Sequence, residues 1–253
     1  MDDESLPLRE RNRLQARDLV LDAAERLLHK SATAEFSMRE LASEAGVGFA
    51  TPFNHFGSKT AIMQALSSRL IERMARCFRE TEPRGNAIDR VLAMGRIAVA
   101  ALLEQPEVNK AVVGSLGQAA SAPSSVRPQS EAIWSLALGD LAGIDVDVRA
   151  RAEATLPQQL AFMFRGCVSF WIAGELSDEQ LPRAFEGGAS TLLLAFADDK
   201  LRAPLLKRIT HLPATAQRSP TDLASDPALS LLTRDAKSRD QRKAPQRPPR
   251  PTR

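Results

Sequence analysis

The stretch from Ser37 to Lys59, which reads SMRELASEAGVGFATPFNHFGSK, constrains the fold more than any other part of the sequence. Ser37 and Glu40 have the S-x-x-E spacing of a capping box, in which each side chain satisfies an unpaired amide at the start of a helix. Gly46 is placed to end that helix in a left-handed conformation. The apolar pattern then resumes, and we expect a second short helix from about Phe49 to His55. Two short helices joined by a glycine turn form a helix-turn-helix, whose second helix fits the DNA major groove.

This stretch and its flanks resemble the DNA-binding region of the TetR/AcrR family of bacterial transcriptional regulators. The resemblance covers about sixty residues, roughly Leu14 to Met74. It implies an all-α protein with an N-terminal three-helix, homeodomain-like helix-turn-helix domain and a larger C-terminal helical domain for ligand binding and dimerisation. The rest of the chain resembles the family only in being helical. The residues that carry the resemblance are Ala23-Ala24, Leu27-Leu28, Ser37-Met38-Arg39-Glu40-Leu41-Ala42, Ala45-Gly46-Val47, Thr51, His55-Phe56 and Ser58-Lys59.

The charge of the chain is uneven, so it says little about partners. The formal net charge is +3, but residues 201–253 hold 12 Lys and Arg against four Asp and Glu. The basic isoelectric point therefore belongs to the C-terminal tail, and the argument for DNA binding rests on the motif. Two cysteines, Cys77 and Cys167, are too few for a disulfide framework. With an acidic N-terminus and no apolar run of about 18 residues, we expect a cytoplasmic, nucleoid-associated protein.

Breaks in the helical pattern suggest three parts. Residues 14–74 form the expected DNA-binding domain, with the helix-turn-helix at 37–56. A long fourth helix runs from Ser58 to about Glu80, and Pro83 and Gly85 mark a boundary. Residues 85–202 form the expected ligand-binding and dimerisation domain. Residues 203–253 are proline-rich, basic and poor in apolar side chains, so we expect disorder there. This tail is read as solvated, with non-specific attraction to nucleic acid as the alternative.

The second domain reads as a succession of helices and breakers, with no pattern of alternating strand residues. Pro157 lies inside one of these helices, where we expect a kink or a break because proline removes a helical hydrogen bond. We place the helices near Ala87–Glu104, Glu107–Ala120, Val126–Leu141, Val146–Gly174 and Ser177–Leu201.

The expected DNA contacts cluster on the second helix of the motif and around it. Thr51 and Asn54 are able to hydrogen-bond with bases or phosphates, and His55 with a phosphate. Lys59 begins the next helix and is the expected phosphate clamp. Proteins of the family usually have tyrosine where Phe53 stands and often have serine where Gly48 stands. With Phe49 and Pro52 beside it, the surface is more apolar than usual, and thymine methyl groups are a reasonable contact. The full predicted set is Arg17, Ser37, Met38, Phe49, Ala50, Thr51, Phe53, Asn54, His55 and Lys59.

No catalytic constellation appears in the second domain, so we expect no enzyme activity, no metal and no cofactor. The three histidines are scattered, and neither a phosphate-binding loop nor a nucleophile elbow is present. The aromatic residues there are read as core, with a ligand cavity between helices as the alternative. In that alternative Trp134, Phe162, Arg165 and Trp171 line the pocket, and Arg165 meets an anionic group of the ligand.

The last two expected helices carry extra apolar faces, which favours a four-helix interface between two copies of the chain. We therefore predict a DNA-binding regulator, homodimeric, responsive to a small molecule and a repressor rather than an activator. The alternative is a small-molecule-binding or protein-interaction module with weakened sequence-specific DNA binding. The apolar faces are formed by Leu156, Leu160, Met163, Cys167 and Phe170 on one helix, and by Ala184, Gly188, Thr191, Leu192 and Ala195 on the other.

Overall fold

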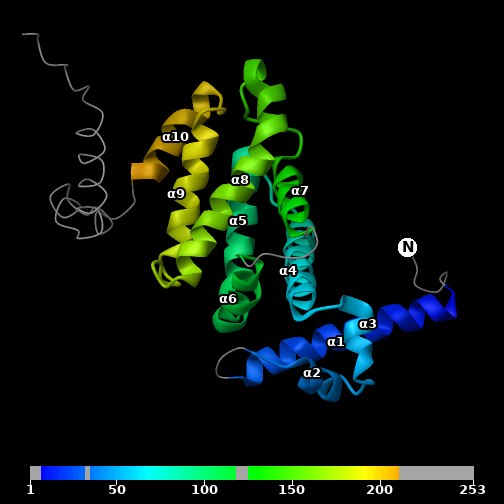
Figure 1. Cartoon of the computed structure of the whole chain (residues 1–253). Coiled ribbons are helices and arrows are strands. Elements are labelled where there is room, and N and C mark those ends of the chain that lie inside the picture. The colour runs from blue at the N-terminus through cyan, green and yellow to red at the C-terminus, as the bar shows by residue number, and fades with distance from the viewer. Residues whose placement is uncertain (1–6, 32–34, 118–124, 211–253) are drawn as a thin grey trace, which may run out of the picture. The chain divides into compact units, whose positions relative to one another are not determined.

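The protein is all-α, as the sequence predicted. The computed structural model describes residues 7–31, 35–117 and 125–210, and within these ranges the regular structure is helical apart from one isolated bridge between Ile144 and Ala197. Figure 1 shows the arrangement. No described helix is long and apolar enough to cross a membrane. The α-helices are α1 (Leu8–Lys30), α2 (Met38–Glu44), α3 (Ala50–Phe56), α4 (Lys59–Thr81), α5 (Ala87–Leu103), α6 (Pro106–Gly114), α7 (Val126–Leu138), α8 (Arg149–Ile172), α9 (Leu181–Leu194) and α10 (Asp199–Thr210).

The first helices enclose a small apolar core. Leu28 of α1, Leu41 of α2 and Ile62 of α4 are almost fully buried in it. Phe56 at the end of α3 packs against the same core from a half-buried position. Gly46 ends the turn after α2 with φ of +66°, a conformation that glycine adopts without steric cost. The predicted helix-turn-helix is therefore present, with α3 as its second helix.

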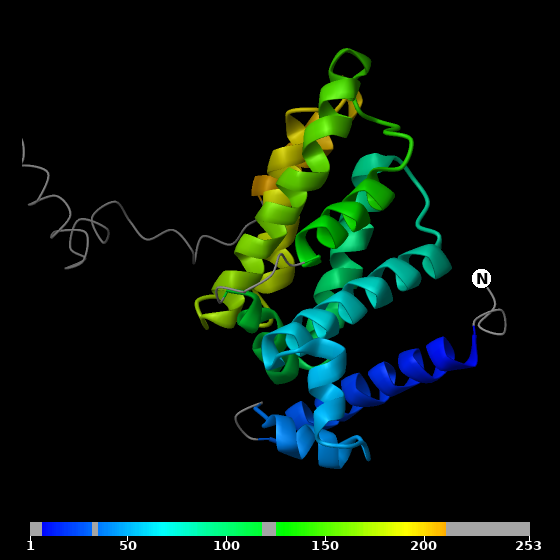
Figure 2. The same ribbon diagram turned by 45° about the vertical axis from the view of Figure 1, so that its right-hand side comes forward.

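A second, larger core lies among α4, α5, α7, α8 and α9. Trp134 of α7 is fully buried at its centre and stacks on Phe185 of α9, with ring centroids 5.6 Å apart. Phe164 of α8 meets both rings edge-on. Figures 1 and 2 show α8, α9 and α10 side by side, and contacts between neighbouring helices of this group agree. Large apolar side chains from distant parts of the chain thus hold this region together.

Helix α4 and helix α6 contribute to both cores. The first half of α4 buries Ile62 in the small core, and its second half buries Phe78 in the large one. Val108 and Val112 of α6 also belong to the small core, although the sequence placed that segment in the second domain. Helices α4 and α6 therefore join the two regions, and the division of the chain into domains stays a prediction.

Several predicted helix boundaries differ from the structure. The expected helix Ser177–Leu201 is two helices, α9 and α10, because the chain turns at residues 195–198. Helix α10 continues to Thr210, so residues 203–210 are helical rather than part of a disordered tail, and Leu205 is buried. The predicted disorder of the later residues falls outside the described part of the chain. Helix α8 passes through Pro157 without a break.

Candidate functional site

The position of α2 is fixed at both of its ends. At its start, the Ser37 hydroxyl accepts a hydrogen bond from the Glu40 amide at 3.2 Å, and the Ser37 amide donates to the Glu40 carboxylate at 2.7 Å. The hydrogen bond from the Ser37 amide is the largest cause that lowers the pKa of the Glu40 carboxyl. The predicted capping box is therefore formed, and it starts α2 directly after the loop from α1.

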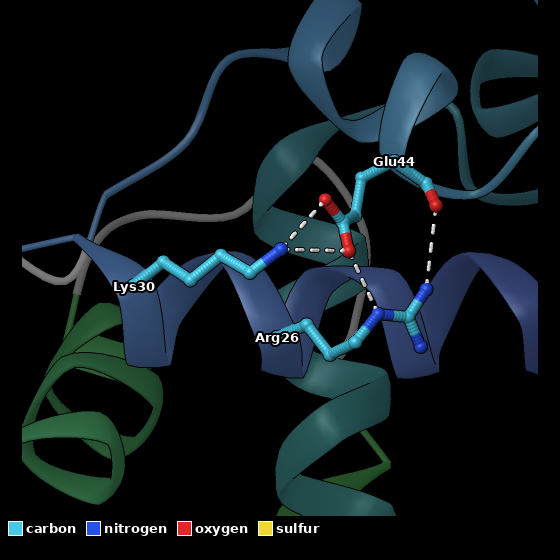
Figure 3. A network of polar contacts seen from close by, with 3 residues as sticks. All are labelled: Arg26, Lys30 and Glu44. Atoms are coloured by element: carbon cyan, nitrogen blue, oxygen red, sulfur yellow. Dashed lines mark hydrogen bonds and ion pairs between the residues drawn. The ribbon is translucent and has the colours of Figure 1, made fainter.

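At the other end of α2, Glu44 ties the helix to α1 (Figure 3). Its carboxylate accepts hydrogen bonds from Arg26 Nε at 2.8 Å and Lys30 Nζ at 3.1 Å. Arg26 also donates to the Glu44 carbonyl oxygen at 3.3 Å. The bonds from Arg26 and then Lys30 lower the pKa of Glu44 below its usual range. The carboxylate is therefore occupied within the protein and turned toward α1.

Helix α3 has one buried face and one exposed face. Pro52 is buried, whereas the side chains of Phe49 and Phe53 are 57% and 40% exposed. Their rings meet edge-on, with centroids 5.6 Å apart. Ala50 and Asn54 are exposed beside them. Residues three and four apart share one side of a helix, so these four side chains form a single surface next to the buried face.

The start of α3 lacks a side-chain cap. Phe49 occupies the N-cap position in a right-handed helical conformation and makes no capping bond. The Thr51 amide instead donates to the Gly48 carbonyl at 2.8 Å. The N-cap position thus falls at Phe49 and not at Gly48, where the family often has serine. Thr51 itself is half-buried, so only part of its side chain faces outward.

Two cationic side chains lie on the helices that flank α2 and α3 in the sequence. Arg17 lies over the Phe56 ring at 4.5 Å from its centroid, and Lys59 Nζ lies 4.8 Å from the centroid of Phe36. The charged groups themselves contact these rings, and both side chains stay partly exposed, so they can still meet an anion. Lys59 also begins α4, whose positive dipole end favours a phosphate at the same place.

Arg39 is one member of the interface that the predicted set omitted. It is exposed on α2, and its guanidinium lies 5.9 Å from the centroid of the exposed Phe49 ring. The signal in the sequence was its place between Met38 and Glu40, where the capping box directs the second helical residue away from the core. Arg39 therefore places a cation beside the exposed Phe49 ring, and the sequence alone does not reveal this contact.

The remaining predicted contacts are placed as follows. Ser37 is exposed, although its hydroxyl is engaged in the capping box. Met38 is half-buried against the small core. His55 is half-buried, with its ring 6.4 Å from that of Phe56. The interface therefore combines an aromatic centre, short polar groups and flanking cations. This combination suits a polyanion that also presents apolar groups in a groove.

A cavity of about 330 Å³ opens among α4, α5, α6, α7 and α8. Phe162 and Arg165, two of the four residues named for a ligand pocket in the sequence analysis, are among its lining residues. Trp134 and Trp171, predicted beside them, are not among its lining residues. Trp134 is enclosed in the large core, and Trp171 is fully buried, with its indole nitrogen donating to Asp178 at 2.7 Å.

Arg165 is the half-buried cation of this cavity. One of its terminal nitrogens donates to the Val113 carbonyl at 3.3 Å. Burial lowers the pKa of its guanidinium, which nevertheless stays charged at neutral pH. Ser67 and Arg127 also line the cavity, from α4 and α7. No local sequence pattern indicated these two residues, because they lie far from Arg165 along the chain.

The N-terminal region defines a helix-turn-helix DNA-binding protein, and comparison with known proteins agrees. Residues 20–66 match the sequence model of the family described as bacterial regulatory proteins, tetR family. A TetR transcriptional regulator from Rhodococcus sp. RHA1 has a similar structure, with a TM-score of 0.60 and 24% identity over 71% of this chain and 97% of that one. Residues 20–66 therefore match the DNA-binding region of the tetR family, and the chain shares the fold of a TetR transcriptional regulator.

Two other solved structures resemble the chain less, with TM-scores below 0.5. A protein with unknown function from Rhodococcus sp. RHA1 is 24% identical over 72% of this chain and 96% of its own, with a TM-score of 0.47. A gamma-butyrolactone receptor described as ArpA-like is 15% identical over 79% of this chain and 98% of its own, with a TM-score of 0.44. Both similarities are too weak to support an argument. No curated protein matches the chain.

TetR-family regulators are generally DNA-binding proteins rather than enzymes. In the described ranges, no group of three or more His, Cys, Asp and Glu side chains is arranged to hold a metal ion. The two candidate sites are the exposed face of α3 and the cavity lined by Arg165.

Proposed function

We propose that this regulator is a homodimeric repressor, which binds an operator through α3 and releases it when a small molecule fills the cavity. The observation that carries the proposal is the exposed face of α3, where Phe49 and Phe53 stand clear of the core, with Arg39 beside the Phe49 ring and Lys59 at the start of the next helix. Aromatic side chains left exposed beside cations are costly unless a partner covers them. An operator supplies both apolar and anionic groups.

On DNA, each part of this surface has a distinct role. Phe49 and Phe53 contact thymine methyl groups in the major groove, and Asn54 hydrogen-bonds with a base edge. Lys59 and Arg39 bind the flanking phosphates, which adds affinity that falls with salt. We expect operators rich in thymine at the positions under α3.

The proposed dimer uses the outer faces of α8 and α9. Phe162 and Phe170 of α8 are 49% and 54% exposed, and Gly166 between them has open space around it. Leu156 and Leu160, which we expected on this face, are instead almost fully buried within the protomer. A second copy covering the exposed phenylalanines would pair two recognition helices. Each helix would then read one half of a two-fold symmetric operator.

Helix α4 is the proposed route from cavity to DNA. It begins at Lys59 beside the DNA-binding face, and Ser67, Leu70 and Met74 farther along it line the cavity. Helix α6 makes a similar connection, with Val112 in the small core and Val113 at the cavity. A ligand that fits one position of α4 better than another would change the spacing of the two α3 helices. Its effect is limited to the difference between its affinities for the two states.

The test is selection of bound genomic fragments by the purified full-length chain, followed by affinity measurements on the selected DNA. We expect Lys59→Ala to weaken binding and to reduce the slope of log affinity against log salt by about one. Lys200→Ala is the matched control, since Lys200 lies exposed on α10, and we expect it to leave both quantities unchanged.

Two outcomes would contradict the proposal. If no fragment is enriched, the chain is instead a binding module that lacks sequence-specific DNA recognition. If fragments are enriched but Lys59→Ala and Phe49→Ala bind them as the parent does, DNA meets another surface. A reporter gene placed behind the selected operator then separates repression from activation by the sign of the change.

A further inference from the structure

The cavity among α4 to α8 combines an apolar wall with a small number of polar groups. Leu70, Ile71, Phe162 and Val168 are among the apolar residues that line it. Its volume of about 330 Å³ is near the lower end of the range for small-molecule sites. A mostly apolar wall favours a ligand with a hydrocarbon body, and the polar groups then decide which end group that ligand carries.

Arg165 has a charge without an acidic partner. Its guanidinium is half-buried, and the bond to the Val113 carbonyl uses only one of its five N–H donors. Among the residues that the structure describes, no carboxylate lies within 4 Å of it, although such pairs hold Arg26, Arg69 and Arg208 elsewhere. A charge withdrawn from water without an opposite charge is costly, so an anionic ligand group would be stabilised there.

A second, independent observation comes from Ser67 of α4. Its side chain is buried, with 2% of the residue's surface exposed, and it lines the same cavity. Its hydroxyl has no hydrogen-bond partner within the described part of the protein. Buried hydroxyls are ordinarily hydrogen-bonded, so an unpartnered one at a cavity wall indicates that a bound molecule completes it.

A second cation, Arg127, lies at the end of the cavity formed by α7. Arg127 and Ser130 line it from the first turns of that helix, where the helix dipole is positive. Unlike Arg165, Arg127 has an acidic partner, because the Glu131 carboxylate lies 3.5 Å from its guanidinium. Arg127 is largely exposed, whereas Arg165 is half-buried. Arg165 is therefore the stronger anchor for an anion.

We propose that the cavity binds a small apolar carboxylic acid, with Arg165 binding the carboxylate and Ser67 hydrogen-bonding to the same ligand. The hydrocarbon body lies against the apolar residues of α4, α5 and α8. That the acid releases DNA rests on the proposed function, whereas binding of the acid in the cavity does not. Binding itself is measured without DNA, so the two ideas fail separately.

The experiment is calorimetric titration of the full-length protein with straight-chain acids from hexanoate to tetradecanoate, each paired with the alcohol of the same length. We expect one site per chain and, at the best length, an acid that binds at least about tenfold tighter than its alcohol, because a charge-assisted hydrogen bond is lost with the alcohol. Equal affinity for acid and alcohol, or no binding by any acid, overturns the proposal. This comparison needs no variant.

Variants then assign the carboxylate to Arg165. Arg165→Gln should remove the preference for acid over alcohol, while Arg151→Gln, an exposed arginine on the same helix, should keep it. Unchanged acid binding in a folded Arg165→Gln protein overturns the assignment. An acid that binds through Arg165 in a protein with no DNA affinity supports the ligand class and contradicts the proposed function. Selective DNA binding by a protein that binds no acid supports the DNA-binding part of the proposed function and contradicts the ligand class.

Discussion

The two regions of the molecule place their sites in opposite ways. The N-terminal region has a small core and carries its site on the outside, on an exposed helix face with Phe49 and Phe53. The rest of the chain has a large core around Trp134 and encloses its candidate site between five helices. An exposed site needs only a few helices held in position, whereas an interior site depends on packing across the whole region. Mutations should therefore separate stability from binding in the first region more cleanly than in the second.

The largest expected effect contrasts an aromatic residue from each region. Trp134→Ala removes a fully buried indole that stacks on Phe185, and we expect a loss of about 3–5 kcal/mol in the free energy of unfolding. Phe49→Ala removes an exposed ring, so stability should change by less than about 0.5 kcal/mol while DNA affinity falls. Urea unfolding followed by circular dichroism, together with DNA titration, measures both.

The two results are informative only as a pair. If Phe49→Ala destabilised the protein as much as Trp134→Ala, the ring would be part of a core that its exposure does not reveal. If it left DNA affinity unchanged, the exposed face of α3 would not be the DNA-binding surface, and the contrast between the regions would fail.

Glycines provide a second, smaller contrast. A Cβ atom at Gly95 of α5 would lie 1.7 Å from the Phe185 ring, and that ring is buried, so Gly95→Ala should cost about 1–3 kcal/mol or more through overpacking. Gly46 has open space, but its φ of +66° disfavours a side chain, and Gly46→Ala should cost roughly 1 kcal/mol. The first glycine provides room for packing and the second provides a turn.

Gly166 is the control for both substitutions. It lies in α8 with a helical conformation and nothing within 4 Å of an added Cβ in one protomer, so Gly166→Ala should stabilise the isolated protomer by about 0.5–1 kcal/mol in urea unfolding at low protein concentration. At concentrations where the proposed dimer forms, a second copy covers this face, so this gain should shrink or become a loss. Measurement across protein concentrations would detect that dependence.

The difference between the exposed site on α3 and the interior cavity also explains which parts of each site the sequence could predict. The helix-turn-helix was predictable because its signals are local: a capping box at Ser37, a turn glycine at Gly46 and a cap at Ser58 lie within one short stretch. Arg39 was missed because its partner ring lies ten residues later, on another helix. These signals fix helix starts well, but they do not show which side chains meet across helices.

The cavity was predicted only in part, for a physical reason. Arg165 and Phe162 stood out as a charge and a ring in an apolar segment, but Ser67 and Arg127 reach the same cavity from distant helices. Aromatic composition alone could not separate the enclosed Trp134 from the lining Phe162. Helix α10 was missed because Pro204 suggested a tail, although the helix accommodates this proline and buries Leu205.

The smallest effect tests whether contacts between charged side chains hold the recognition motif in place. Glu44→Gln removes the carboxylate that joins Arg26 and Lys30 to α2, and we expect a small decrease in the urea midpoint at neutral pH. Because these bonds lower the pKa of the folded-state carboxylate, their stabilisation is present above the ordinary glutamate pKa of about 4.3 and is lost as the pH falls through the lower folded-state value. The difference between parent and variant should therefore be constant near neutrality and vanish in acid.

Glu72→Gln is the matched control for this change, since Glu72 is exposed on α4 and its substitution should leave the midpoint unchanged at every pH. A Glu44→Gln difference that persists in strong acid would mean that the carboxylate charge is not what matters at this position. A difference that disappears in acid and also shrinks with added salt would identify an exposed ion pair. The orientation of α2 would then depend on exposed charges, while the helices around Trp134 depend on apolar packing, and DNA affinity would respond to salt through the protein as well as through the phosphates.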